Sequence, residues 1–210
     1  MFQINIKNKS YKDKTVLENI SISISKNGIY GVVGKNGEGK TTLFKSIIRL
    51  TSFEGSIAHE TEISLQGKIA WCPTDPLIYD ELTAKEFAVF YQELLNIKKN
   101  DFQMFDVPQD KLIKTFSTGM KKKAYMNAIF QKEYSIYIFD EPFNGLDLES
   151  NYLLMNYIRE LSKTSIIFIS SHILEILYKD CSKIFLVKDK KIKEFEKAQF
   201  IEIEEELFSK

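Results

Sequence analysis

The chain has 210 residues, of which 44% are hydrophobic and 13% aromatic, enough for one large domain with a substantial core. Its 29 basic side chains balance 29 acidic ones, so no overall field favours nucleic acid and no charge excess favours disorder. No apolar run approaches the roughly 18 residues that span a bilayer, and the N-terminus lacks the pattern of a signal peptide. We therefore expect a cytosolic protein whose two cysteines, Cys72 and Cys181, are free thiols.

Residues 1–26 alternate between apolar and polar side chains in two bursts separated by a polar turn, which predicts an antiparallel hairpin. Tyr11 stands at the turn. A tyrosine there can lie on the surface as a hydrophobic anchor or stack on a nucleotide base, and the pattern favours neither.

A glycine-rich stretch then separates a predicted buried strand, residues 28–33, from a predicted helix, residues 42–50. The pattern G-x-x-x-x-G-K-T is made by Gly34, Gly39, Lys40 and Thr41. Glycines allow successive backbone N–H groups to surround an anion, and Lys40 adds a cation. Thr41 places a hydroxyl within reach of a magnesium ion shared with the phosphates. The stretch therefore predicts a phosphate-binding loop, the alternative being a glycine turn without a ligand.

The middle of the chain reads as two short strands followed by two helices. The strands are predicted near residues 55–57 and 68–72, and the helices over 84–96 and 119–131, with a polar loop over 98–109 between them. Thr83 and Glu86 have the spacing of a capping box at the start of the first helix. The second helix carries the basic run Lys121-Lys122-Lys123, which is typical of a solvated face.

Residues 134–139 form a near-continuous apolar strand that ends in Asp140 and Glu141. A buried parallel strand has this composition when its carboxyl end faces a ligand crevice. Asp140 would then reach the magnesium, and Glu141 would polarise an attacking water. The alternative is a turn that leaves both charges in solvent.

Another apolar strand, residues 165–170, ends at Ser171-His172. A neutral imidazole at that edge can form a hydrogen bond with a γ-phosphate or with the water beside it. A helix predicted over 150–161 lies between the two strands and gives the alternating order of an α/β fold. The chain is expected to end in a hairpin over 183–195 and an acidic surface helix over 202–206.

In this order the motifs resemble those of the ATP-binding cassette (ABC) family of transporter ATPases, over essentially the whole chain. The resemblance implies an α/β P-loop NTPase fold with a mostly parallel core sheet and an N-terminal antiparallel β subdomain. It also implies one nucleotide-binding domain over residues 1–210, with a helical subdomain inserted at about 77–133. Its ligands would be ATP and Mg²⁺. The residues implied to bind the nucleotide are Tyr11, Gly34, Lys35, Asn36, Gly37, Glu38, Gly39, Lys40, Thr41, Thr42, Ser117, Gly119 and Asp147.

The same resemblance assigns chemical roles. Lys40, the catalytic glutamate Glu141 and the switch histidine His172 would act in catalysis. The implied magnesium ligands are Thr41, Asp140 and Thr74.

Two segments depart from the family pattern. Thr74 stands where the family has the Q-loop glutamine, and residues 116–120 read Phe-Ser-Thr-Gly-Met where the family signature is Leu-Ser-Gly-Gly-Gln. Ser117 and Gly119, the two signature positions that touch phosphate in the family, are kept. The combination is similar to small single-cassette ATPases of drug, bacteriocin and sodium exporters.

The resemblance also implies partners. Two cassettes, as a homodimer or a paired cassette, would close head to tail around two ATP molecules, and Ser117 would contact the nucleotide of the opposite subunit. A separately encoded transmembrane permease would bind near residues 74–96 and hold the chain at the inner face of the cell membrane, with no part for nucleic acid. The alternatives are a soluble ABC-type ATPase that regulates an assembly, and a module that senses ATP without cleaving it.

Overall fold

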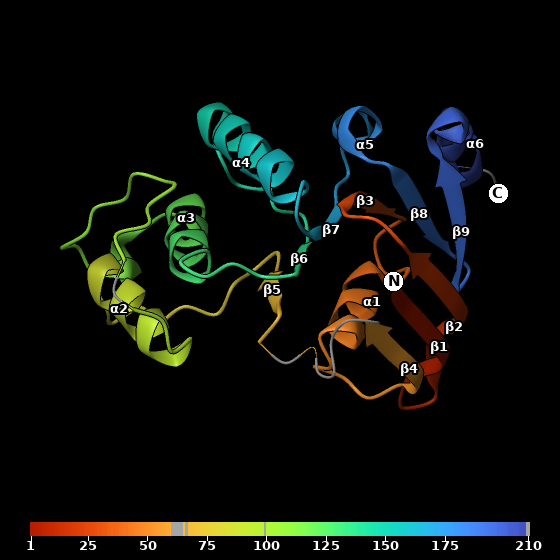
Figure 1. The fold of residues 1–210 in the computed structure, drawn as a ribbon, viewed down its shortest axis with the longest axis horizontal. Helices are drawn as coiled ribbons and strands as arrows, with labels where there is room; N and C mark the ends of the chain where they lie inside the picture. Colours follow the sequence, from red (N-terminus) through yellow and green to blue (C-terminus); the bar gives the residue numbers. More distant parts are fainter. Residues whose placement is uncertain (60–64, 66, 99, 209–210) are drawn as a thin grey trace.

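Two β-sheets form the framework of the chain (Figure 1). The computed structural model describes residues 1–59, 65, 67–98 and 100–208. A three-stranded antiparallel sheet has the order β2-β1-β4, and a six-stranded sheet has the order β5-β6-β7-β3-β8-β9. The strands are β1 (Phe2–Tyr11), β2 (Lys14–Ile24), β3 (Gly28–Val33), β4 (Glu54–His59), β5 (Ile69–Cys72), β6 (Ile136–Phe139), β7 (Ile166–Ser170), β8 (Lys183–Lys188) and β9 (Lys191–Glu196).

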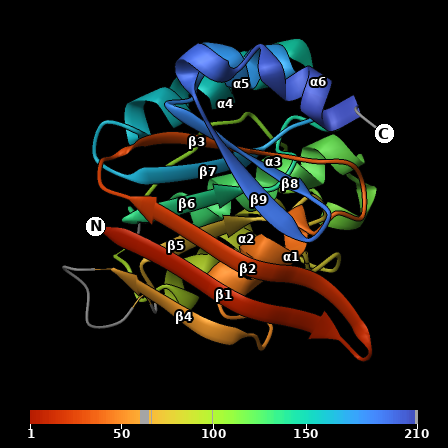
Figure 2. The same ribbon diagram turned by 90° about the vertical axis from the view of Figure 1, so that its right-hand side faces the viewer.

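Helices lie on both faces of the six-stranded sheet and beyond its β5 edge. They are α1 (Lys40–Ile47), α2 (Ala84–Leu94), α3 (Thr118–Ile129), α4 (Leu148–Leu161), α5 (Leu174–Asp180) and α6 (Glu202–Phe208), with short 3₁₀ turns at Ile113–Thr115 and Lys197–Gln199. Figure 2 shows α4, α5 and α6 over one face, while the antiparallel sheet lies on the other side. In Figure 1, α2 and α3 stand apart from the rest, next to β5. Among the described residues, no helix has the length and apolarity needed to cross a bilayer.

The central strands are buried on both faces. Alternate residues belong to different cores: Phe139 and Ile169 pack with the helices α3 to α6, whereas Ile138 and Phe168 pack with α1 and the antiparallel sheet. Because successive side chains in a strand point to opposite faces, a strand covered on both sides must be apolar throughout. This explains the near-continuous apolar runs from which these strands were predicted.

Strands β3, β5, β6, β7 and β8 run parallel, and only β9 joins this sheet in the antiparallel sense. The register aligns Val32 with Ser170, and Phe139 with Ile169. The carboxyl ends of β3, β6 and β7 therefore meet at one edge of the sheet.

The predicted fold class is confirmed, with shifts at element ends. The capping box at Thr83 and Glu86 forms at the start of α2, and Cys72 and Cys181 are buried free thiols. The helix predicted over 42–50 is wrong at its carboxyl end, since α1 stops at Ile47 and Leu50 is 66% exposed. A positive φ of 58° at residue 49 turns the chain out of the helix, so Leu50 cannot continue the apolar stripe.

Candidate functional site

The glycine-rich loop joins β3 to α1 with two glycines in the left-handed backbone region. Gly37 and Gly39 have φ angles of 87° and 114°, in the left-handed region. A Cβ on Gly39 would also lie 3.0 Å from Val16 Cγ1. Gly39 is the N-cap of α1 and provides no side chain to cap it. The first N–H groups of the helix and its positive dipole end are therefore available to an anion.

The Lys40 side chain is buried beneath this loop. Its Nζ donates to the carbonyl oxygens of Gly34 at 2.8 Å and Lys35 at 3.4 Å. Burial lowers the pKa of the Lys40 ammonium, while the nearby charges of Glu141 and Asp140 oppose that effect. The loop thus holds one cation in place by hydrogen bonds that a phosphate oxygen can replace.

The other loop positions lie at the surface of the same turn. Lys35, Asn36 and Gly37 are exposed, whereas Glu38 Oε2 accepts a hydrogen bond from the backbone N–H of Asp189 at 3.0 Å. Lys35 and Asn36 also border a cavity of about 250 Å³ together with His172 and Leu207 of α6. The loop and His172 therefore share one cavity.

Asp140 lies against the helix that follows the loop. Thr41 Oγ1 donates to Asp140 Oδ2 at 2.6 Å, and Ser170 Oγ, at the end of β7, donates to Oδ1 at 2.7 Å. A hydroxyl and a carboxylate are the hard oxygen donors that Mg²⁺ prefers. Among the described residues no group of three or more His, Cys, Asp or Glu could hold a metal alone. The pair could therefore hold a magnesium ion if phosphates and water supplied its remaining ligands.

Sequence analysis missed Ser170, which joins the two acidic residues. Besides donating to Asp140, its hydroxyl accepts the backbone N–H of Glu141 at 2.9 Å, and it is fully buried. The sequence signal that could have identified Ser170 is its position as a polar residue at the end of the apolar run 166–169.

Glu141 and His172 face each other across the edge. Glu141 Oε2 accepts the backbone N–H of His172 at 3.2 Å, and His172 Nε2 lies 3.0 Å from Oε1. Oε1 is buried and accepts no hydrogen bond from the described residues, so its contact with the His172 ring is electrostatic. Burial raises the pKa of the Glu141 carboxyl, an effect opposed by His172 and Lys40. A buried carboxylate with one unused acceptor and raised basicity is suited to polarise a water.

Thr74 and Tyr11 border the cluster. The Thr74 hydroxyl, just after β5, donates to the backbone carbonyl of Asp140 at 3.1 Å and so supports the main chain of that residue. The Tyr11 hydroxyl interacts with the side chains of Thr51 and Thr42, and Lys9 Nζ lies 3.9 Å from the centroid of its ring, which is 45% exposed. Magnesium binding by Thr74 and base stacking by Tyr11 stay predictions.

The signature residues lie elsewhere, since α3 and α1 are on opposite sides of β5 and β6 in Figure 1. Ser117 is exposed and caps α3 by accepting the backbone N–H of Met120 at 3.3 Å. Asp147 caps α4 and forms an ion pair with Lys123 at 2.6 Å. Hydrogen bonds from Lys123 and then from Ser150 lower the pKa of the Asp147 carboxyl. Within one chain, Ser117 and Asp147 therefore cap helices, and Asp147 also forms an ion pair.

The prediction that residues 121–123 form a solvated face is wrong for Lys122. Lys121 pairs with Asp80 at 2.6 Å, but Lys122 is only 2% exposed. Its Nζ donates to the carbonyl oxygens of Glu141 at 3.2 Å and Asn144 at 2.9 Å. Successive helical residues are about 100° apart, so one member of a basic run can point inward while its neighbours stay at the surface.

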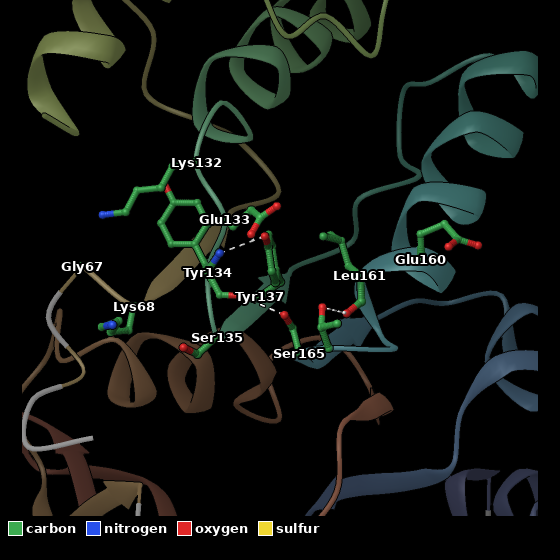
Figure 3. A pocket seen from close by; sticks show the side chains of 11 residues that line it. Gly67, Lys68, Lys132, Glu133, Tyr134, Ser135, Tyr137, Glu160, Leu161 and Ser165 are labelled. Carbon is green, nitrogen blue, oxygen red and sulfur yellow. Dashed lines mark hydrogen bonds between the residues drawn. The ribbon is translucent and has the colours of Figure 1, made fainter. Parts of the chain in front are cut away.

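A wide cavity lies at the opposite edge of the sheet, near the amino ends of β5, β6 and β7 (Figure 3). It has a volume of about 660 Å³ and is bordered by residues such as Lys132 and Glu160. Its inner polar groups satisfy one another: Tyr134 N–H donates to the Tyr137 hydroxyl at 3.0 Å, and Ser165 Oγ donates to the Tyr134 carbonyl at 2.8 Å. The paired carboxylates and the glycine loop are absent from this lining, so we place the functional site at the carboxyl edge.

A strand, glycine loop and helix, with acidic residues at the end of β6 and a histidine just after its neighbour β7, define an α/β P-loop nucleotide-binding protein. Comparison with known sequences makes the assignment narrower. Residues 17–144 match the family described as ABC transporter. The chain belongs to the ABC transporter family.

Individual relatives agree with this assignment. The chain is 32% identical to the uncharacterized ABC transporter ATP-binding protein YcbN of Bacillus subtilis, over 91% of this chain and 68% of that protein. It is 27% identical to the SkfA peptide export ATP-binding protein SkfE of the same organism, over 91% of this chain and 87% of that protein. The fold is similar to a solved structure titled "Structure of ATP binding subunit of ABC transporter", with a TM-score of 0.85 at 23% identity, covering 100% of this chain and 95% of that one.

Proposed function

We propose that this chain hydrolyses ATP in the presence of Mg²⁺ and thereby drives the membrane subunit of an exporter. One observation carries the proposal: Thr41, Asp140 and Glu141 come from segments about a hundred residues apart in the sequence, yet Thr41 Oγ1 and Asp140 Oδ2 are 2.6 Å apart at the edge where Glu141 meets His172. Export is supported by the printed name of the relative SkfE, an ATP-binding protein of peptide export.

Residues at the carboxyl edge of the six-stranded sheet have separate roles in the proposed reaction. The loop N–H groups from Gly34 to Thr42 and the ammonium of Lys40 bind the phosphates of ATP, which is the substrate. Thr41 and Asp140 would hold Mg²⁺, which neutralises charge on the phosphates, and Thr74 would complete its surroundings. Glu141 orients the attacking water, and His172 fixes the Glu141 carboxylate through its backbone N–H at Oε2 and its ring beside Oε1. Positioning and electrostatic stabilisation lower the barrier.

A second cassette completes each site. Two copies close head to tail, so that each chain supplies Lys40 and Glu141 to one ATP, and Ser117 and Gly119 to the other. Ser117 is exposed at the amino end of α3, where a helix can receive the γ-phosphate of a facing subunit. Asp147, exposed and paired with Lys123 of the same helix, would lie at the same interface, and Tyr11 would stack on the base.

The helical part of the chain offers a surface for the permease. We propose a single domain over residues 1–210 in which residues 77–133 form an inserted subdomain. Several large apolar side chains of this stretch are exposed, Leu77 at 81% and Leu94 at 63%, together with Tyr79 and Val89. These side chains lie on α2 and in the segment before it, where contact with a membrane subunit would remove them from water. A permease bound there would hold the cassette at the cytoplasmic face of the membrane.

Phosphate release from ATP tests the enzymatic part of the proposal. The purified chain should release phosphate only with Mg²⁺ present. The Glu141→Gln protein should still bind ATP, form a longer-lived dimer and turn over about a hundredfold more slowly or worse. Lys40→Ala should instead weaken ATP binding itself.

Glu160→Gln is the matched control, because this glutamate lies at the opposite edge and pairs with Lys163 on the surface. It should leave turnover unchanged. Normal turnover by Glu141→Gln would remove Glu141 from its role, and ATP binding without any Mg²⁺-dependent phosphate release would identify an ATP sensor.

A further inference from the structure

Lys122 is a buried charge at a position that the catalytic scheme leaves unused. Its side chain is 2% exposed, and an ammonium in such surroundings is costly unless it is well hydrogen-bonded. The bonds it makes are to the main-chain carbonyls of Glu141 and Asn144. Burial lowers the pKa of Lys122, an effect opposed by the negative charges nearby, first Asp75 and then Glu141 and Asp140. The ammonium group of Lys122 therefore points at the turn after β6, which carries the proposed general base Glu141.

The main chain of Glu141 needs such support. Its φ is 49°, a left-handed conformation that is strained for a residue with a side chain and persists only where neighbours enforce it. Its N–H donates to Ser170 Oγ at 2.9 Å, and its carbonyl accepts from Lys122 Nζ at 3.2 Å. Two side chains from separate elements, β7 and α3, thus hold the two sides of this residue.

The first two turns of α3 also contact the chain segment that follows β6, residues 141–147. A Cβ on Gly119 would lie 2.2 Å from the carbonyl oxygen of Gly145, so the backbones are in direct contact there. Lys122 and Lys123 add a hydrogen bond to Asn144 and an ion pair to Asp147. The helix that begins at the signature serine is therefore attached to the segment 141–147 at three successive points.

We propose that Lys122 is a positioning residue for Glu141, and that it links the signature segment, which would contact the ATP of one site, to the general base of the other site. This inference rests on the proposed function. If α3 shifts when the facing ATP is bound or released, Lys122 carries the movement to the main chain of Glu141. Chemistry at one site is then sensitive to occupancy of the other.

Substitutions at two adjacent lysines test the positioning role. Lys122→Met should lower kcat about 30- to 100-fold, because displacing a catalytic group by about 1 Å costs that much, while KM and the affinity for ATP change less than about threefold. Lys122→Arg keeps donors in place and should recover part of kcat. Lys121→Met removes the same charge from the adjacent surface pair with Asp80 and should stay within about twofold of wild type.

A double-mutant cycle separates positioning from general destabilisation. In single-turnover assays, Lys122→Met added to Glu141→Gln should cause no further loss beyond about threefold, because the group that Lys122 positions is already inactive. A loss that multiplies with that of Glu141→Gln, or a kcat within threefold of wild type for Lys122→Met alone, would overturn the inference. Wild-type hydrolysis with unaffected Lys122 variants would leave the proposed function intact.

A structural readout decides the case independently of activity. A crystal structure of the Lys122→Met protein, or of Lys122→Leu if the first variant does not fold, should show the Glu141 carboxylate withdrawn from His172. A structure in which Glu141 keeps its φ and its contact with His172 would contradict the proposal even if the wild type hydrolyses no ATP.

Discussion

Replacement of Ser170 by alanine removes a hydroxyl that holds both acidic residues at once. Ser170 Oγ is fully buried, donates to Asp140 Oδ1 at 2.7 Å and accepts the N–H of Glu141 at 2.9 Å. A buried N–H left without an acceptor costs about 1–3 kcal/mol, and a hydrogen bond to a carboxylate contributes about 1.5–3 kcal/mol. Since the two terms share one hydroxyl and are not additive, we expect a loss of about 2–4 kcal/mol in the free energy of unfolding.

The same substitution should weaken magnesium binding. Residues that orient a metal ligand without touching the metal typically change metal affinity by about 10- to 100-fold when removed. Ser170→Ala should therefore raise the Mg²⁺ concentration needed for half-maximal phosphate release by that factor. Urea denaturation measures the stability, and titration of phosphate release with Mg²⁺ measures the affinity.

Ser165 provides the matched control, because it is a buried serine immediately before the amino end of the same strand. Its hydroxyl makes one neutral hydrogen bond, to the Tyr134 carbonyl at 2.8 Å. Ser165→Ala should cost about 1 kcal/mol and leave the Mg²⁺ requirement unchanged. If Ser170→Ala and Ser165→Ala showed the same Mg²⁺ requirement, the orienting role of Ser170 would be refuted.

Three further measurements address the site and the core. Burial raises the pKa of Glu141, and a general base must be ionised to act. As the pH is lowered, kcat should therefore begin to fall above the ordinary glutamate pKa of about 4.3. A kcat that stays constant down to that pH contradicts the assignment of Glu141 as the base. Gly119→Ala should displace α3 from Gly145 and reduce turnover at least about tenfold without weakening ATP binding to the single chain, and normal turnover would show that the close approach is unimportant. Cys72 and Cys181 are buried thiols with raised pKa values, so a thiol reagent should label them only as fast as the chain unfolds, and rapid labelling of the native protein would contradict their burial.

The features read correctly from the sequence are those that depend on neighbouring residues. The glycine loop is a contiguous segment whose backbone angles and lysine act together, so its position between β3 and α1 could be predicted. The strands β6 and β7 were visible because burial on both faces requires apolar side chains throughout. Their shared edge followed from the alternating order of strands and helices.

The features that were missed depend on register and rotation. Ser170 meets Asp140 because β6 and β7 pair in one particular register, and nothing in the residue types specifies that register. Lys122 points inward to the turn after β6, although Lys121 and Lys123 have the same side chain and pair with Asp80 and Asp147. Leu50 fits the helical spacing of apolar residues in the sequence, but it follows Arg49, whose positive φ ends the helical path after α1. Patterns of residue type can predict an element, whereas contacts between distant elements require the fold.

A crystal structure of the Glu141→Gln protein with ATP and Mg²⁺ tests the central claim most directly, because this variant should retain the nucleotide. The account predicts phosphates enclosed by the loop beside Lys40, the metal ion on Thr41 and Asp140, and Ser117 of a second copy across the γ-phosphate. Nucleotide bound instead in the cavity at the amino ends of β5, β6 and β7, or a metal ion away from Asp140, would contradict it.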